Sequence, residues 1–405
     1  MYISIILAFG IIVTLQAFGD IISAKTNGKL PSIFVSAILF LIGFWTVIPT
    51  EVTTAAGQQT TILDISGISS SLFVLLLTLL VTNMGSLMTI KELLAQWRTV
   101  LIGIAALGGV MVFAYFVGGS IFGREVGLVT APPLAGGLAA MSIMVTEANE
   151  LGRSDLALIS ALVFATQGLL GYPIMTYVLR RRAGAILGDY KAGKIKLLEQ
   201  SEPAADAAKS RFKFIPEFPA KYLTPPVLIA KVAIVGILAD AASKLTGGMV
   251  HTYVLCLVFG IIASEIGFLD KKILGKSETM GLMMVLLMGF VFGGLADASI
   301  ETMSMVFAPL VLTMIIGVAG LIVFSVIAGK ILKENWAMSI AIGINCLCGF
   351  PPNYILTNEA AQAISSSKEE YEVLMQEMLP KVLVGGFATV TVGSVIVANI
   401  FVGLM

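Results

Sequence analysis

Two short stretches of the chain place polar side chains beside residues that break helices. Residues 137–148 read GLAAMSIMVTEA, residues 349–360 read GFPPNYILTNEA, and both lie in mostly apolar surroundings. Each stretch carries a glutamate near its end, Glu147 or Glu359. A carboxylate deep in a membrane can exchange protons or hold a cation, and its energetic cost makes it a candidate for function; a carboxylate at the membrane surface needs no such role. Both interpretations are open for this pair.

The surroundings of these stretches have the composition of an integral membrane protein. Hydrophobic residues make up 57% of the 405 positions, charged residues only 12%, and the mean hydropathy is +0.97. A helix needs roughly 20 apolar residues to cross a bilayer, and such runs recur along most of the chain. The short alternating strands of a membrane β-barrel are absent from the sequence. We therefore expect an all-α polytopic membrane protein.

The apolar runs predict ten spans. The first run lacks the basic start and the small-residue cleavage site of a secretory leader, so we expect it to be a span. The spans are expected near residues 3–23, 31–49, 70–88, 99–120, 156–179, 226–244, 252–269, 279–296, 305–329 and 380–403. Two further apolar segments, about 127–150 and 336–361, are interrupted by glycine, proline and polar residues. Residues 361–378 then predict an amphipathic helix along the inner membrane surface.

Basic residues predict the orientation of the chain in the membrane. If each broken segment enters and leaves on the same side, all of the 25 lysines and arginines except Arg124, Arg153 and Lys244 fall on one side. The polar linker 183–223 lies on that side too. Positive charge collects on the cytoplasmic side of membrane proteins. The pattern therefore predicts a plasma (inner) membrane protein with re-entrant hairpins, both termini outside and a cytoplasmic linker.

Internal similarity predicts that the chain consists of two repeats. AFGDIISAKTNG at 17–28 resembles ILADAASKLTGG at 237–248, and the stretches at 137–148 and 349–360 align in the same order. Each half would hold five spans, an odd number, so the second half would lie inverted relative to the first. We expect a first repeat over 1–182, the linker over 183–223 and a second repeat over 224–405.

The two broken segments predict a binding site. Irregular backbone at membrane depth must be buried in protein or line a cavity, and broken helix ends present amides and carbonyls to anions and cations. Paired breaks in inverted halves are typical of a secondary transporter, and a plain kink is the alternative. The expected substrate-binding residues are Gly136, Gly137, Ser142, Gly349, Pro351, Pro352, Asn353, Thr357 and Asn358. The expected ion-coupling residues are Glu147, Asn149, Asn345 and Glu359.

The order of these features resembles the glutamate:sodium symporter family and, more distantly, the 2-hydroxycarboxylate (citrate:sodium) transporters. The resemblance covers nearly the whole chain, including LPSIFVSAILFLIG at 30–43 and the final apolar run. Where the family's first hairpin has Gly-Gly-His-Gly-Thr, this chain has GGLAA at 136–140; in the second motif Gly349 and Pro352 match, and Asn358 lies one place after the family's asparagine. The family implies sodium coupling, an elevator-type architecture and a homodimer.

Two transport mechanisms fit this pattern. The leading hypothesis is a cation-coupled symporter, with Na⁺ as the ion, for a small organic anion or amino acid such as a glutamate-like carboxylate. The rival is a cation/proton antiporter in which Glu147 and Glu359 exchange the protons; inverted repeats with broken helices serve both purposes. A channel is disfavoured, because two unlike hairpins supply no symmetric ring of carbonyls or charges.

The sequence offers no catalytic or metal-binding motif. His251 is the single histidine, and Cys256, Cys346 and Cys348 have no metal-ligand company. Acidic residues such as Glu199 interrupt the basic linker, which fits anionic lipid better than nucleic acid. We expect no enzyme and no cofactor beyond the transported Na⁺ or H⁺. The expected partners are a small-molecule substrate and the lipid bilayer.

Overall fold

The computed structural model describes residues 4–49, 51–53, 59–87, 89–195, 215, 219–247, 250, 252–298 and 300–405. Regular structure in these ranges is helical, apart from a two-stranded antiparallel ribbon of β1 (Glu51–Thr53) and β2 (Gln59–Thr61). Six of the described helices are long and apolar enough to cross a membrane: Ile5–Lys25, Trp97–Phe122, Asp155–Lys191, Pro225–Leu245, Ala308–Ile331 and Lys368–Val390. They agree with the expected all-α membrane class.

Each expected span coincides with a helix, but four of these helices are shorter than predicted. They are α2 (Ser32–Thr46), α4 (Ser70–Gly85), α11 (Thr252–Glu265) and α13 (Met280–Gly293). At 1.5 Å per residue, the 14 residues of α11 cover only about 20 Å of a hydrocarbon core of about 30 Å. A left-handed Gly267 follows α11, and a 3₁₀ turn, η3 (Gly294–Asp297), follows α13. Apolar composition therefore overstated the helix lengths, and the number of membrane crossings stays a prediction.

The chain divides into two compact units, and each draws on both halves of the sequence. Unit 1 comprises residues 1–67, 97–195 and 291–405, and unit 2 comprises 68–96 and 196–290. These units do not coincide with the expected repeats, which stay a prediction. Most of the expected linker lies outside the described residues. Its described start is helical, because α9 (Ser154–Lys191) continues beyond the predicted end of the span at 179.

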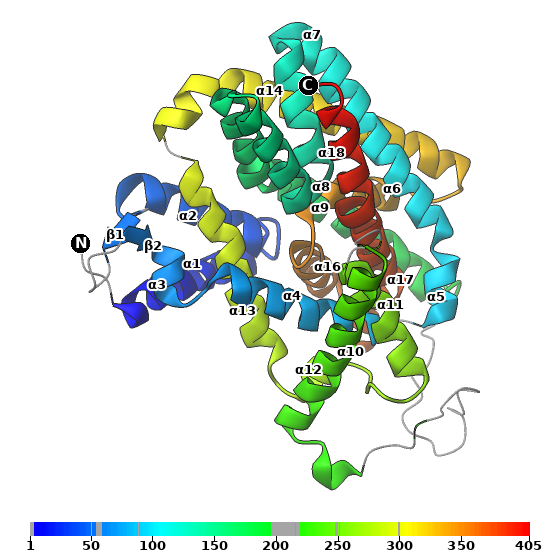
Figure 1. The fold of residues 1–405 in the computed structure, drawn as a ribbon. Coiled ribbons are helices and arrows are strands. Elements are labelled where there is room, and N and C mark those ends of the chain that lie inside the picture. Colours follow the sequence, from blue (N-terminus) through cyan, green and yellow to red (C-terminus); the bar gives the residue numbers. More distant parts are fainter. Residues whose placement is uncertain are drawn as a thin grey trace. The chain divides into compact units, whose positions relative to one another are not determined.

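Unit 1 is built around α9. Its other helices are α1 (Ile5–Lys25), α2, α3 (Ile62–Ser66), α6 (Trp97–Val110), η1 (Met111–Gly118), α7 (Gly119–Phe122), α8 (Arg124–Glu150), η3, α14 (Ile300–Ile331), α15 (Trp336–Cys348), α16 (Pro352–Ile364), α17 (Lys368–Phe387), η4 (Ala388–Gly393) and α18 (Ser394–Val402). Helix α9 packs against α8, α15 and α16, and α18, red in Figure 1, packs against α8. These contacts bring the two broken segments and the last span together.

Glycines allow α6 and α14 to approach closely. A Cβ on Gly109 would lie 2.4 Å from the carbonyl oxygen of Gly320, and one on Gly320 would lie 2.3 Å from that of Gly109. Small residues at such crossings let membrane helices pack backbone to backbone. The pair therefore holds α14 against α6, next to the helices that carry the breaks.

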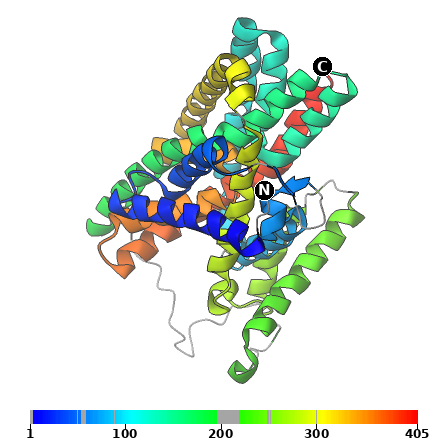
Figure 2. The same cartoon turned by 90° about the vertical axis from the view of Figure 1, so that its left-hand side faces the viewer.

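The first two helices form a pair within unit 1. Helix α1, dark blue in Figure 2, packs against α2. Ser4 caps α1 by accepting a hydrogen bond from the Leu7 amide (3.2 Å), which satisfies one free donor of the first turn. A small apolar cluster of Ala8, Ile48, Val52 and Ile62 joins α1 to the β ribbon and α3.

The predicted amphipathic helix at 361–378 is wrong as a single element. Helix α16 ends at Ile364, and α17 begins at Lys368 and continues into the last span. Ser367 caps α17 by accepting from the Glu370 amide (3.2 Å), and Glu370 accepts from the Ser366 amide (2.7 Å). This reciprocal arrangement resembles a capping box, which starts a new helix. Local capping therefore divided a segment that hydrophobic periodicity alone had joined.

Unit 2 contains α4, α5 (Ile90–Ala95), η2 (Ala220–Tyr222), α10 (Pro225–Leu245), α11, α12 (Ile273–Lys276) and α13 up to Phe290. Lys231 of α10 pairs with Asp270 (2.9 Å), which also pairs with Lys276 (3.2 Å). Partial burial pushes the pKa of Asp270 upward, but hydrogen bonds from the two lysines outweigh it, so the pKa lies below its ordinary value. The cluster ties α10 to the loop that follows α11.

Candidate functional site

The first break lies inside α8, at two glycines. Gly136 has φ 172° and ψ 68°, and Gly137 has φ 72° and ψ −165°. The conformation of Gly137 belongs to a region that side-chain-bearing residues essentially never adopt. Pro132 and Pro133 precede the glycines. The break expected at Gly136 and Gly137 is therefore present.

The second break separates α15 from α16, and its glycine repeats the geometry of the first. Gly349 has φ 64° and ψ −176°, close to the values of Gly137. Pro351 and Pro352 follow directly at the start of α16. The two glycines that the sequence alignment pairs thus share one rare backbone conformation.

Both breaks converge on one turn of the last span. A Cβ on Gly137 would lie 3.0 Å from Val390 Cγ1, and a Cβ on Gly386 would lie 2.7 Å from Asn353 Nδ2 and 3.3 Å from Asn345 Oδ1. Four residues, about one helical turn, separate Gly386 from Val390. The first break therefore lies near the asparagines that flank the second.

The last span is irregular where the breaks meet it. Residues Ala388–Gly393 form the π-helical η4, and Thr389 Oγ1 donates to the carbonyls of Gly385 (2.9 Å) and Gly386 (3.2 Å). Widened π-helical turns occur frequently at functional sites. Gly386, Thr389 and Val390 were not among the expected site residues. The Gly-Gly pair at 385–386 was the signal in the sequence that could have pointed to them.

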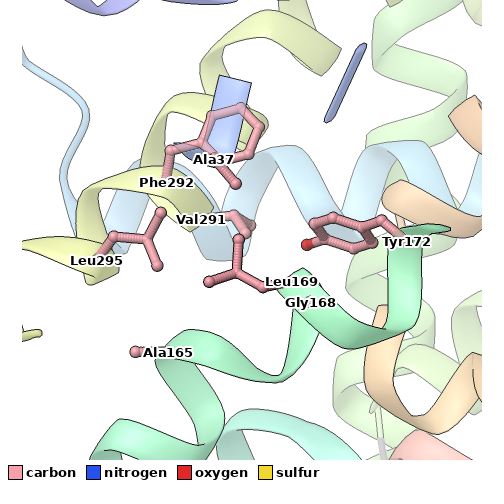
Figure 3. Close-up of a pocket in the computed structure, with 8 residues that line it drawn as sticks. All are labelled: Ala37, Ala165, Gly168, Leu169, Tyr172, Val291, Phe292 and Leu295. Carbon is pink, nitrogen blue, oxygen red and sulfur yellow. The ribbon is translucent and has the colours of Figure 1, made fainter. Parts of the chain in front are cut away.

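Helix α9 packs against the second break. A Cβ on Gly171 would lie 3.0 Å from Leu347 Cβ and 3.1 Å from Cys348 Sγ, next to the second break. The neighbouring Tyr172 lines a small cavity of about 20 Å³, shared with Ala37 of α2 and Phe292 of α13. Figure 3 shows the Tyr172 hydroxyl directed toward the side chains of Leu169 and Val291. The cavity has room for about one water molecule, so it is too small for an organic substrate.

The second break is rich in oxygen acceptors. Asn345 and Asn353 are buried (0% and 1% exposed), and the Oδ1 atom of each has no hydrogen-bond partner among the described residues. The carbonyls of Leu347 and Cys348 would normally receive bonds from the amides four residues on, but those positions are Pro351 and Pro352, which have no N–H. The two prolines therefore leave these two carbonyls without their usual helical donors.

The start of α16 does not provide the expected free amides. Pro351 and Pro352 carry none, the Asn353 amide donates to the Gly349 carbonyl (3.0 Å), and the Tyr354 amide donates to that of Pro351 (3.0 Å). The amides at the start of α16 are therefore absent or hydrogen-bonded within the chain, and the expectation that this helix start holds an anion stays a prediction. After the first break, by contrast, residues 138–141 all carry an N–H. The two breaks therefore differ in how many of the residues that follow the glycine carry an N–H.

The predicted acidic residues lie away from the breaks. Glu359 follows Pro351 by two helical turns, about 12 Å, and both of its carboxylate oxygens accept from the Ser32 amide at the start of α2 (3.2 Å each). Glu147 is half-buried, follows Gly137 by about 15 Å along the helix and makes no side-chain hydrogen bond with any described residue. Along the chain, each glutamate therefore lies more than two helical turns from its break.

The remaining predicted residues divide between structural and exposed positions. Asn358 Oδ1 accepts from the Tyr371 hydroxyl (2.6 Å), and Thr357 donates to the Asn353 carbonyl (2.7 Å). Ser142 and Asn149 of α8 are exposed within unit 1. Asn345 and Asn353 are thus the predicted polar side chains that the fold brings together at a break.

The two ends of the first broken segment return to one place. Arg153, just before α9, forms a bidentate pair with Glu125 at the start of α8 (2.8 and 2.9 Å). Arg153 also bonds to Asp155 (2.9 Å). Residues 125 and 153 are therefore in contact although the whole of the broken segment lies between them, as a hairpin requires.

Comparisons with known proteins give no family. No protein-family model matches the chain, and no curated protein matches it either. The resemblance to the glutamate:sodium symporters stays a prediction. Among the described residues, no group of three or more His, Cys, Asp or Glu side chains could hold a metal ion.

Proposed function

We propose that the chain is a secondary active transporter that couples a cation, Na⁺, to the symport of a small organic anion or amino acid. In this proposal the two breaks at Gly137 and Gly349 line the binding site, and the site is exposed alternately to the two sides of the membrane. The single observation that carries the proposal is the convergence of both breaks on Gly386–Val390 of the last span. Broken helices that meet in this way are typical of transporter sites.

The polarity of the breaks supports symport of an anion with a cation. The first break is followed by residues that all carry an N–H, whereas the second presents Asn345 Oδ1, Asn353 Oδ1 and two carbonyls without their helical donors. A helix start favours anions and a helix end favours cations. An organic anion at the first break and a cation at the second would neutralise each other in a site with little water.

Proton antiport through Glu147 and Glu359 is the alternative. Both carboxylates lie more than two helical turns from the breaks, and Glu359 is occupied by the Ser32 amide. If these carboxylates exchanged the protons, the exchange would take place at the far ends of the broken segments and not where the two breaks meet at Gly386–Val390. We therefore favour the symporter.

Orientation and assembly belong to the same proposal. We place the protein in the plasma (inner) membrane with both termini outside and the central linker in the cytoplasm, as a homodimer that works by an elevator motion. The distribution of lysine and arginine supports the orientation. Single cysteines placed at residues 29 and 244 test it, because only the second should react with an impermeant thiol reagent added outside.

Reconstituted liposomes test the function. Uptake of labelled small carboxylates and amino acids should be driven by an inward Na⁺ gradient and abolished when choline replaces Na⁺. Uptake of none of these compounds, combined with Na⁺-driven efflux of protons, would favour the antiporter. Glu147→Gln and Glu359→Gln separate the two mechanisms, since antiport requires both carboxylates and symport does not.

A further inference from the structure

Five basic residues gather around the turn that joins α1 to α2. Arg180 of α9 donates a hydrogen bond from Nη1 to the Asn27 carbonyl in this turn. The other four each lie within two residues of one end of that bond: Lys25, Lys29, Arg181 and Arg182. We call these five residues the basic cluster. The bond brings the basic end of α1 and the three consecutive arginines of α9 together, although they are far apart in the chain.

The charge of the basic cluster is not balanced by the described part of the chain. No member of the cluster forms an ion pair with a described residue. Two carboxylates on the adjoining helices, Asp20 of α1 and Glu359 of α16, are both bonded to Ser32 instead. At the end of α9, by contrast, Lys191 pairs with Glu370 (3.1 Å). The cluster is therefore a local excess of positive charge that an anion from outside the chain could neutralise.

Exposed apolar side chains lead up to the basic cluster along both helices. Phe18 and Ile21 of α1 are 52% and 49% exposed. They share a helix face with Lys25, at spacings of three and four residues. On α9, Tyr177 is 55% exposed, and the Arg181 guanidinium lies over its ring, 5.4 Å from the centroid. Exposed tyrosines at the end of a span are typical of the membrane–water interface, so the cluster lies where lipid headgroups would be.

We propose that the basic cluster binds the headgroup of an anionic phospholipid, with the acyl chains along the exposed face of α1. Clusters of about four to eight Lys or Arg directly after a membrane-spanning helix are typical of sites for anionic lipid. Arginine also forms strong charge-assisted hydrogen bonds with phosphate. The leaflet that supplies the lipid rests on the orientation proposed above, whereas binding itself does not.

The apolar residues beside the cluster favour a lipid over a soluble anion. A free phosphate ion or an acidic peptide could neutralise the bases, but neither would gain from contact with the exposed Phe18 and Ile21 side chains. A phospholipid joins an anionic group to apolar chains in one molecule, which matches the order of surfaces along α1.

A bound lipid would stabilise the junction between α1 and the second broken segment. A Cβ on Gly28 would lie 3.1 Å from Arg180 Nη1 and 3.3 Å from Ala363 Cβ of α16. The turn after α1 is therefore packed against both α9 and α16. Like charges destabilise a compact state by repelling one another, so an anion that neutralises the cluster should raise the melting temperature.

The thermal stability of the purified full-length protein in detergent micelles tests lipid binding. A ligand that binds the folded state raises Tm, so dioleoyl phosphatidylglycerol is titrated into the micelles. Dioleoyl phosphatidylcholine, which has the same chains and no net charge, is the reference. We expect a saturable rise in Tm with phosphatidylglycerol and not with phosphatidylcholine. The rise should shrink at high salt, because salt screens the interaction between charges.

Lys25→Gln/Arg181→Gln removes two exposed bases of the cluster. Each base near an anionic lipid surface contributes about fivefold to affinity, so the midpoint of the rise should move to about 25-fold more phosphatidylglycerol. The matched control is Lys330→Gln/Lys333→Gln. These two lysines near the end of α14 are also exposed, and neither is ion-paired within the described ranges. The control removes the same charge elsewhere and should keep the wild type's response.

Four results would overturn the proposal: equal effects of the two lipids on the Tm of the wild type, a wild-type response in Lys25→Gln/Arg181→Gln, an equal loss of response in the control, or the same rise with sodium phosphate or polyglutamate in place of lipid. If the double variant does not fold, Lys29→Gln replaces it. Its midpoint should move to about fivefold more phosphatidylglycerol, and an unchanged midpoint would count against the site.

Discussion

Gly349→Ala probes the break on which the proposed site depends. Gly349 has φ 64° and ψ −176°, a conformation essentially restricted to glycine, and forcing another residue into it costs about 1–3 kcal/mol. No heavy atom outside the neighbouring residues lies within 4 Å of the Cβ that alanine would add. The cost is therefore backbone strain alone, without a steric clash. We expect the free energy of unfolding to fall by about 1–3 kcal/mol, or the break to rearrange.

Gly184→Ala is the matched control. Gly184 is an exposed position inside α9, and it too has nothing within 4 Å of an added Cβ. Alanine stabilises a helix interior relative to glycine by roughly 0.5–1 kcal/mol. The two variants add the same methyl group, so their stabilities should differ by about 1.5–4 kcal/mol, in opposite directions from the wild type.

Two measurements read out the comparison. Thermal melting in detergent gives the order of stability, and hydrogen exchange over residues 345–355 shows whether the strain is released locally. We expect Gly349→Ala to melt below the wild type or to exchange faster at the break, and to lose substrate binding in either case. A Gly349→Ala protein with the melting temperature, exchange and binding of Gly184→Ala would refute the assignment of the break.

The contacts around the site and in unit 2 give three further expectations. Glu359→Ala should lower stability by about 0.5–2 kcal/mol through loss of the cap on α2, with Glu359→Gln in between; equal melting of both variants and the wild type would contradict this role. Asp270 has a lowered pKa, so its contribution to the free energy of unfolding is complete above the unfolded-state pKa near 3.8 and is lost as pH falls through the lower folded-state pKa. Asp270→Asn should abolish this part of the acid-induced loss of stability. An unchanged pH profile would count against this role. Lys231→Met should lower the free energy of unfolding at neutral pH, because it removes one of the two lysines that pair with Asp270. Gly109→Ala and Gly320→Ala should each lower the free energy of unfolding by about 1–3 kcal/mol, because the added methyl group overpacks α6 against α14. Melting temperatures equal to the wild type's would show that the two helices can move apart without cost.

Hydrophobic composition predicted the helical membrane class and the positions of the helices, because a continuous apolar run admits few other structures in a bilayer. It overstated the lengths of α11 and α13, since local backbone turns rather than hydrophobicity determine where these helices end. It also joined residues 361–378 into one helix, where the caps at Ser367 and Glu370 start a new one. Helix boundaries depend on single hydrogen bonds that a hydropathy pattern does not contain.

The sequence by itself determined where the backbone breaks, because Gly137 and Gly349 occupy conformations closed to other residues and two prolines remove donors after the second glycine. Only the tertiary structure decided which groups meet there. It brings both breaks to Gly386–Val390 and leaves the Oδ1 atoms of Asn345 and Asn353 without partners, while it uses Glu359 to cap a distant helix. The physical reason is that a side chain's role follows from its partners, and these partners come from helices far apart in the chain.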